Sequence, residues 1–220
     1  MTAGDVGMTI HDMDVIGEVS RWTTGRSTEH GGVGDSGILT AFGIFQGLRA
    51  CAAFVWGSSD LDGRRVGVAR VGKVGGRLIG HLVGAGALVT AVDPSPSARE
   101  AVIDTYRTVR FVESIDELLD RELDVVSPNA LGGFLTPDRA ASMRAAFVCG
   151  GANNQLTEPE VGDLQAQRGI VYVPDFMVNC GGVIQVAEEL VGRDLERARS
   201  ARRGYSRRPR GSWSARVRRG

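Results

Sequence analysis

Residues 66–75 of this chain read Val66-Gly67-Val68-Ala69-Arg70-Val71-Gly72-Lys73-Val74-Gly75. A short β-branched run is followed by glycines that permit a tight turn, and then by the start of an amphipathic helix. In such a unit, Gly72 would let the backbone approach a pyrophosphate, and Gly75 would let the helix pack on the sheet. The free N–H groups and the dipole at the helix start favour an anion. We therefore predict a phosphate-binding loop that comprises Gly72, Lys73, Val74 and Gly75.

A carboxylate, Asp93, follows the next predicted strand, about 20 residues beyond the loop. A carboxylate at that place can accept hydrogen bonds from both hydroxyls of an adenosine ribose, and its charge repels a 2′-phosphate. The pattern therefore predicts NAD as the cofactor in preference to NADP. The alternative is an ordinary surface aspartate after a strand.

Arg70 departs from the pattern, because the fingerprint expects its first glycine there. A side chain at this position can crowd the turn or the path of the pyrophosphate, whereas a guanidinium could instead pair with phosphate. The steric interpretation is favoured. On that interpretation, Arg70→Gly should tighten NADH binding in a fluorescence titration.

From Arg64 onward, short apolar runs alternate with amphipathic stretches, which is typical of parallel strands covered by helices on both faces. The predicted fold class is α/β, a Rossmann-like doubly wound parallel sheet with a remnant of a substrate domain. Residues 36–56 carry apolar side chains at helical spacing after a glycine-rich loop, 31–37, which suits a hinge or a ligand-facing turn. The predicted strands are 65–69, 88–92, 109–112, 124–127, 146–149 and 170–173.

Helix ends are marked by local signals. Two capping boxes are predicted, Ser114 with Glu117 and Thr157 with Glu160. Thr136 before a proline predicts a third helix start, and a glycine before the last strand, Gly169, predicts a helix stop.

The composition is that of an ordinary globular protein, with 42% hydrophobic and 24% charged residues in 220. The first residues lack the features of a secretory signal, and no stretch is expected to approach the length of a membrane span. A cytoplasmic location is expected. Three cysteines and three histidines are scattered without metal-ligand spacing, so no metal site is predicted.

Charge is distributed unevenly along the chain, although the formal net charge is zero. Residues 197–220 contain ten arginines and no acid, so the remainder carries a net charge of −10. This segment is predicted to be a basic, disordered tail, either a reading-frame slip or a true variant terminus. Specific nucleic-acid binding by this segment is disfavoured, because positive charge alone is weak evidence for a nucleic-acid site. Lys73 is the one lysine of the chain.

Several motifs occur in a fixed order and together resemble the glutamate/leucine/phenylalanine/valine dehydrogenase family, most closely its leucine/valine/phenylalanine branch. After the phosphate loop come Pro128-Asn129-Ala130-Leu131-Gly132-Gly133, Gly151-Ala152-Asn153-Asn154-Gln155-Leu156 and Pro174-Asp175-Phe176-Met177-Val178-Asn179-Cys180-Gly181-Gly182. Upstream, Thr23-Thr24-Gly25-Arg26-Ser27, Gly34-Asp35-Ser36 and Thr40-Ala41-Phe42-Gly43 also fit. The resemblance covers about residues 1–196.

The resemblance implies roles for individual residues. Asp5, in Thr2-Ala3-Gly4-Asp5-Val6-Gly7-Met8-Thr9, would be the catalytic carboxylate that assists proton transfer. Val183 and Val186 would line the substrate side-chain pocket. The remaining cofactor-binding residues would be Thr40, Ala130, Asn153, Asn154 and Asn179. For the Asn153-Asn154 pair, a capping or turning role after the strand stays open.

The same resemblance implies two catalytic lysines in an upstream glycine-rich motif, which this sequence does not contain, and Lys73 lies in the phosphate loop. The expected reaction is NAD-dependent oxidative deamination of valine, leucine or phenylalanine to the 2-oxo acid and ammonia, as a truncated chain. The alternatives are an inactive NAD-binding module or pseudoenzyme and, ranked last, a basic-tailed nucleic-acid binder. Homo-oligomer formation is a further possibility that the sequence does not decide. The expected domains are a substrate-domain remnant and hinge at 1–34, the NAD-binding domain at 35–196, and the tail.

Overall fold

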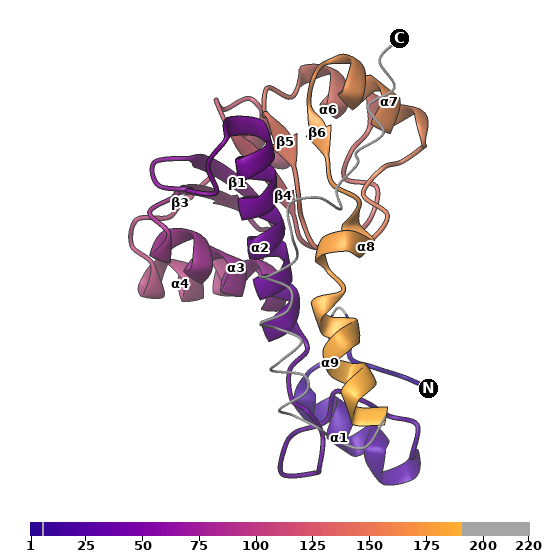
Figure 1. Cartoon of the computed structure of the whole chain (residues 1–220). Coiled ribbons are helices and arrows are strands. Elements are labelled where there is room, and N and C mark those ends of the chain that lie inside the picture. Colours follow the sequence, from indigo (N-terminus) through magenta and orange to yellow (C-terminus); the bar gives the residue numbers. More distant parts are fainter. Residues whose placement is uncertain (6, 191–220) are drawn as a thin grey trace.

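The computed structural model describes residues 1–5 and 7–190 (Figure 1). A six-stranded sheet has the order β3-β2-β1-β4-β5-β6, and each of its neighbouring pairs is parallel. This is the strand order of a doubly wound dinucleotide-binding fold. The strands β1 to β3 are added on one side of the sheet, and β4 to β6 on the other, so the switch point lies between β1 and β4. The predicted α/β class is confirmed.

The strand bounds follow the predicted apolar runs. The strands are β1 (Arg65–Ala69), β2 (Leu88–Val92), β3 (Arg110–Phe111), β4 (Val125–Pro128), β5 (Phe147–Val148) and β6 (Val171–Tyr172). Strands β1 and β2 have the predicted bounds, and β4 is displaced by one residue. Strands β3, β5 and β6 are shorter than predicted, because each pairs with its inner neighbour over two residues only.

The helices connect these strands and extend below them. They are α1 (Ile10–Val19), α2 (Gly37–Trp56), α3 (Lys73–Gly84), α4 (Pro96–Thr105), α5 (Ile115–Leu119), α6 (Pro137–Ser142), α7 (Glu160–Gln167), α8 (Asp175–Val178) and α9 (Gly181–Leu190).

Alternate residues of the central strands enter two separate apolar cores. Val66, Val125 and Phe147 pack with residues of α2 and α3, whereas Val126 and Val148 pack with residues of α5, α6 and α7. Side chains alternate along a strand, so strands buried on both faces need continuous apolar runs. The same runs that predicted the strands therefore also explain the two helical layers.

Helix α2 is long and apolar, and its 20 residues are sufficient by length and composition to cross a membrane. The expectation that no stretch approaches that length is therefore wrong. Ile44 and Leu48 are nonetheless fully buried in the core of the fold. A Cβ at Gly47 would lie 2.4 Å from a methyl carbon of Val178, so this glycine allows the end of α8 to touch the helix. These contacts are those of a core helix.

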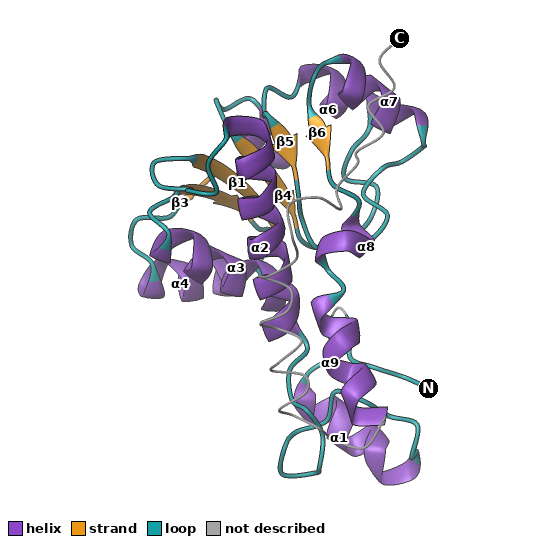
Figure 2. Ribbon diagram, viewed as in Figure 1, coloured by secondary structure: helices purple, strands orange, loops and turns teal. Residues whose placement is uncertain are grey.

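The segment before residue 34, which includes α1, and helix α9 are far apart in the sequence but together form a lower lobe. Figure 2 shows α2 and α9 running side by side from the sheet toward α1. The Glu189 carboxylate accepts a hydrogen bond of 2.7 Å from the Gly25 N–H, and the Gln185 amide donates one of 2.8 Å to the Val33 carbonyl. Helix α9 thus packs on the segment before residue 34, and the predicted domain division stays a prediction.

The helix-end predictions have mixed outcomes. Thr136 caps α6, and Gly169 has the left-handed φ of 72°. Only half of the predicted capping box at Ser114 forms: its hydroxyl accepts from the Glu117 N–H, but the Glu117 carboxylate accepts from the Glu113 N–H instead of the Ser114 N–H. The capping box at Thr157 is wrong, because α7 begins after Pro159 and the Thr157 hydroxyl instead donates to the Leu135 carbonyl. A capping box that the sequence analysis missed joins Thr9 and Asp12 at α1. The predicted basic tail, 197–220, lies outside the described residues.

Candidate dinucleotide-binding site

The residues that follow the parallel strands meet at one edge of the sheet. Arg70 follows β1, Asp93 follows β2, Asn129 follows β4 and Asp175 follows β6. In open parallel sheets, ligands bind outside the carboxyl ends of the strands at the switch point, which here lies between β1 and β4. The fold therefore brings the sequence-predicted phosphate loop, Asp93 and the asparagine motifs to the same edge of the sheet.

The phosphate loop has the geometry that its glycines predict. Gly72 is the N-cap residue of α3, and a Cβ placed on it would meet no atom within 4 Å. A Cβ on Gly75 would lie 2.0 Å from the Arg70 carbonyl oxygen, so the helix can approach β1 only with glycine there. The open backbone at Gly72 and the first N–H groups of α3 fit a pyrophosphate.

Lys73 and Val74 occupy the first turn of α3. The Lys73 ammonium donates to the Met8 carbonyl, on the segment that also carries Asp5. Val74 is partly buried against the apolar core. The lysine side chain thus links the phosphate loop to the N-terminal segment.

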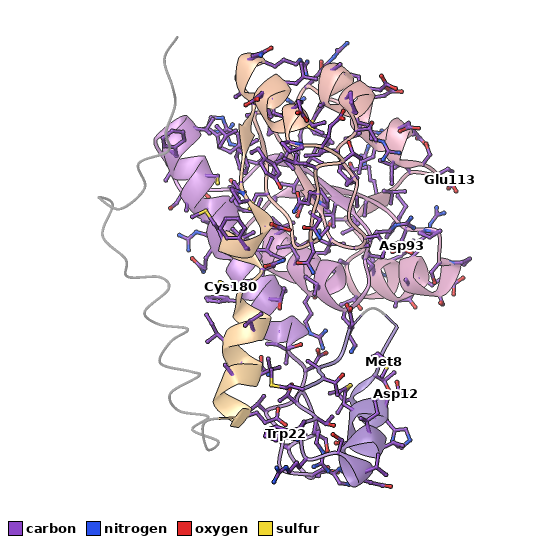
Figure 3. All side chains as sticks on the ribbon, turned by 90° about the vertical axis from the view of Figure 1, so that its right-hand side faces the viewer. Met8, Asp12, Trp22, Asp93, Glu113 and Cys180 are labelled. Atoms are coloured by element: carbon purple, nitrogen blue, oxygen red, sulfur yellow. The ribbon has the colours of Figure 1, made fainter. Side chains whose placement is uncertain are left out.

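Asp93 is not an ordinary surface aspartate, because only 8% of its surface is exposed. One carboxylate oxygen accepts a 2.8 Å hydrogen bond from the Val71 N–H, and the other accepts a 2.9 Å bond from the Ser95 N–H. Each carboxylate oxygen can accept a further bond. Asp93, labelled in Figure 3, therefore holds the turn before α3 in place and keeps lone pairs for further donors.

Arg70 has a φ of +75°, the left-handed conformation that glycine adopts freely. For a residue with a Cβ, that conformation costs about 1 kcal/mol. The Arg70 N–H donates to the Val92 carbonyl at 2.8 Å, so the strained turn is attached to the end of β2. The backbone thus keeps the glycine conformation in spite of the arginine.

Asn129 organises the loops after β4 and β5, and the sequence analysis did not single it out. Its amide nitrogen donates to the Ser127 carbonyl at 2.8 Å, and its amide oxygen accepts from the Gly151 N–H at 3.1 Å. The neighbouring Ala130 is partly exposed at the same edge. The side chain of Asn129 is therefore a structural tie beneath the predicted cofactor contact at Ala130.

Two of the three predicted asparagines contact each other. The Asn179 amide nitrogen donates to the Asn153 amide oxygen at 2.6 Å and to the Gly151 carbonyl at 3.2 Å. Asn154 has a left-handed φ of 51°, and its N–H donates to the Asp175 carboxylate at 2.5 Å. Asn154 thus turns the chain, as the structural alternative for this pair predicts. Asn153 and Asn179, in contrast, contact each other through their amides.

Thr40 lies at the contact between α2 and α9. Its hydroxyl donates to the Ser36 carbonyl at 3.0 Å, and a Cβ on Gly182 would lie 2.5 Å from that hydroxyl oxygen. Val183, on the same turn of α9, is 68% exposed, and Val186 is half-buried. Thr40 thus contacts the first turn of α9, the helix that carries Val183 and Val186.

Asp5 is exposed on the N-terminal segment. Its carbonyl accepts a hydrogen bond of 3.0 Å from the Met8 N–H, in the turn that meets Lys73. The predicted catalytic aspartate thus lies on a segment joined to the phosphate loop, and its role stays a prediction.

Two titratable groups near the edge, Tyr172 and Cys149, have raised pKa values. Burial, reinforced by the charge of Asp175, raises the pKa of Tyr172 to about 12. A hydrogen bond with Cys51, together with burial, raises the pKa of Cys149 well above its usual value. Neither group is a ready nucleophile. Within residues 1–5 and 7–190, no cluster of three or more metal-ligating side chains occurs.

Comparisons with known proteins agree with this geometry. Residues 95–201 match the model of the family described as glutamate/leucine/phenylalanine/valine dehydrogenase. The chain is 48% identical to a valine dehydrogenase of Streptomyces coelicolor, over 91% of this chain and 55% of that protein. It is 36% identical to a leucine dehydrogenase of Bacillus subtilis, over 90% of this chain and 54% of that protein. The chain therefore spans about half the length of the curated relatives it matches.

A solved structure has the same architecture. The L-tryptophan dehydrogenase of Nostoc punctiforme superposes with a TM-score of 0.77 at 29% sequence identity, over 94% of this chain and 58% of that one.

Proposed function

Because this chain belongs to the glutamate/leucine/phenylalanine/valine dehydrogenase family, we propose that it forms the NAD-binding part of an enzyme that oxidatively deaminates an apolar L-amino acid. The products would be the 2-oxo acid, ammonia and NADH. The observation that carries the proposal is the loop at Gly72 and Gly75, tied through the Val71 N–H to the buried Asp93. We also propose a cytoplasmic location and the formation of homo-oligomers.

The adenosine diphosphate part of the cofactor would lie along the phosphate loop and Asp93. The N–H groups at the start of α3 would donate to the pyrophosphate, because no atom stands over Gly72. Asp93 would accept from the ribose hydroxyls with its remaining lone pairs. This charge arrangement supports NAD as the cofactor.

The nicotinamide part would lie near the loops that follow β4 and β5. NAD, when bound, accepts the hydride from the α-carbon of the amino acid. Asn153 and Asn179, joined by their 2.6 Å hydrogen bond, would orient the carboxamide without adding charge, and Ala130 and Thr40 would flank the ring and its ribose. Asp5 would hold or transfer the proton at the amino nitrogen.

The residues at the start of α9 support an apolar substrate. Val183 is exposed and Val186 is half-buried, so this face offers an apolar surface. A glutamate side chain would need a cationic partner when it leaves water. The curated relatives act on valine and leucine by their names, which supports an aliphatic or aromatic substrate.

NADH binding by the purified 220-residue protein tests the proposal. We expect the fluorescence of NADH to change saturably as protein is added, and an excess of NAD to reverse the change. Nicotinamide mononucleotide, which lacks the adenosine half, should bind far more weakly because it cannot reach Asp93. Failure of folded protein to bind NADH would contradict the proposed function.

A second candidate, an NAD-binding module without turnover, is favoured by one observation. The one lysine of the sequence donates its ammonium to the Met8 carbonyl and sits in the phosphate loop. We therefore expect this polypeptide alone to bind NADH but to reduce NAD negligibly with valine, leucine or phenylalanine. Production of NADH above a blank without protein would refute the second candidate and leave the first.

A further inference from the structure

The corner beyond the end of β2 holds an arginine that no described residue neutralises. Within residues 1–5 and 7–190, no hydrogen bond or ion pair engages the guanidinium of Arg70, which is half-buried. The other arginine of this corner, Arg99, is committed to the Glu113 carboxylate through contacts of 3.0 and 2.7 Å. Asp93 and Glu113 lie on the same side of the molecule (Figure 3). Among the described residues, the Arg70 guanidinium therefore carries a positive charge that no carboxylate neutralises, whereas that of Arg99 is paired.

Backbone contacts place Arg70 next to the end of β2, where Asp93 would accept from the ribose. Its N–H donates to the Val92 carbonyl, and the next N–H, of Val71, donates to the Asp93 carboxylate, both at 2.8 Å. The pyrophosphate end lies two residues further along, at Gly72 and the start of α3. A side chain that starts at Arg70 thus starts next to the carboxylate that would hold the ribose.

Two serines follow Asp93 along the chain, and the Ser95 N–H donates to its carboxylate at 2.9 Å. The Ser95 and Ser97 hydroxyl oxygens lie 3.0 Å apart at the beginning of α4, a ten-residue helix whose dipole favours an anion there. A carboxylate alone in this position repels a 2′-phosphate, but a neighbouring guanidinium offsets that charge and can bind phosphate through two parallel N–H bonds.

We propose that Arg70, with Ser95 and Ser97, forms an acceptor site for the 2′-phosphate of adenosine, so that this chain binds NADP(H) as well as NAD(H). The inference rests on the proposed function, because it concerns the same dinucleotide site. Asp93 retains the unphosphorylated ribose, and Arg70 admits the phosphorylated one. The replacement of the expected glycine thereby changes cofactor selectivity.

Titrations of the full chain with NADH and NADPH test this inference. We expect the two dissociation constants to agree within about threefold. Arg70→Gln removes the charge and keeps a long side chain on the same strained backbone. It should weaken NADPH binding relative to NADH by about tenfold, the effect of one ionic contact of about 1.4 kcal/mol, and Arg70→Lys should restore most of the loss. Arg107→Gln, an equal charge change on an exposed residue, should leave the ratio unchanged.

Calorimetry on the unaltered chain gives an answer that does not depend on any variant folding. Adenosine 2′,5′-bisphosphate should bind about tenfold more tightly than adenosine 5′-monophosphate, and the difference should shrink as salt is raised from about 0.05 to about 0.5 M. If NADH binds but NADPH is excluded, or if Arg70→Gln weakens both alike, the inference fails and the proposed function stands. If neither dinucleotide binds to folded protein, both fail.

Discussion

Replacing Gly75 by alanine is expected to lower the free energy of unfolding by about 3 kcal/mol and to abolish measurable NADH binding. The added Cβ would lie 2.0 Å from the Arg70 carbonyl oxygen and 3.0 Å from its carbonyl carbon. Backbone atoms cannot rotate away as a flexible side chain can, so α3 must move away from β1. Overpacking of this kind costs on the order of 1–3 kcal/mol, and the moved helix start no longer faces the pyrophosphate. Urea denaturation and a fluorescence titration measure the two effects.

Two other glycines of the same region serve as matched controls. At Gly84, the last residue of α3, a Cβ meets nothing within 4 Å, so Gly84→Ala should stabilise the protein by up to about 1 kcal/mol. At Gly72 a Cβ also meets nothing, so Gly72→Ala should leave unfolding nearly unchanged while it weakens NADH binding. A Gly75→Ala protein that unfolds at the same urea concentration as the parent would refute the steric account.

The apolar pattern predicted the sheet well, because strands buried on both faces leave a continuous signal. The pattern could not show that Arg70 keeps the left-handed φ of a glycine, because arginine rarely adopts that conformation. The bonds of Val92 and Asp93 to this turn hold it in place, and they come from a strand about 20 residues away.

Long-range contacts account for the residues that sequence reasoning missed. Asn129 bonds Gly151 and Asp175 bonds Asn154, each across 21 or 22 residues and from a different strand. The Thr157 hydroxyl has the local sequence of a helix cap, yet it donates to Leu135 because residues 135 and 156 form an isolated bridge. Tertiary contacts of this kind override local capping signals.

Asp93→Ala is expected to weaken NADH binding by about 100-fold. The variant loses the acceptor for two ribose hydroxyls, and hydrogen bonds to a charged group contribute about 1.5 kcal/mol each, so their sum corresponds to about two powers of ten in affinity. It also leaves the Val71 N–H, which now donates to Asp93 at 2.8 Å, without its acceptor. The free energy of unfolding should therefore fall by about 1–3 kcal/mol. Calorimetric titration and urea denaturation measure these quantities.

Two further variants separate the charge of Asp93 from its shape. Asp93→Asn keeps an oxygen acceptor and should lose about tenfold in affinity, whereas Asp104→Ala, on the exposed face of α4, should match the parent. The nucleotides should respond differently, since removal of the carboxylate also removes its repulsion of a 2′-phosphate. Asp93→Ala should thus weaken NADPH binding less than NADH binding, provided that Arg70 is intact. An Asp93→Ala protein that binds NADH within about threefold of the parent would show that the ribose lies elsewhere, because no other carboxylate among the described residues accepts from the backbone of residues 70–75.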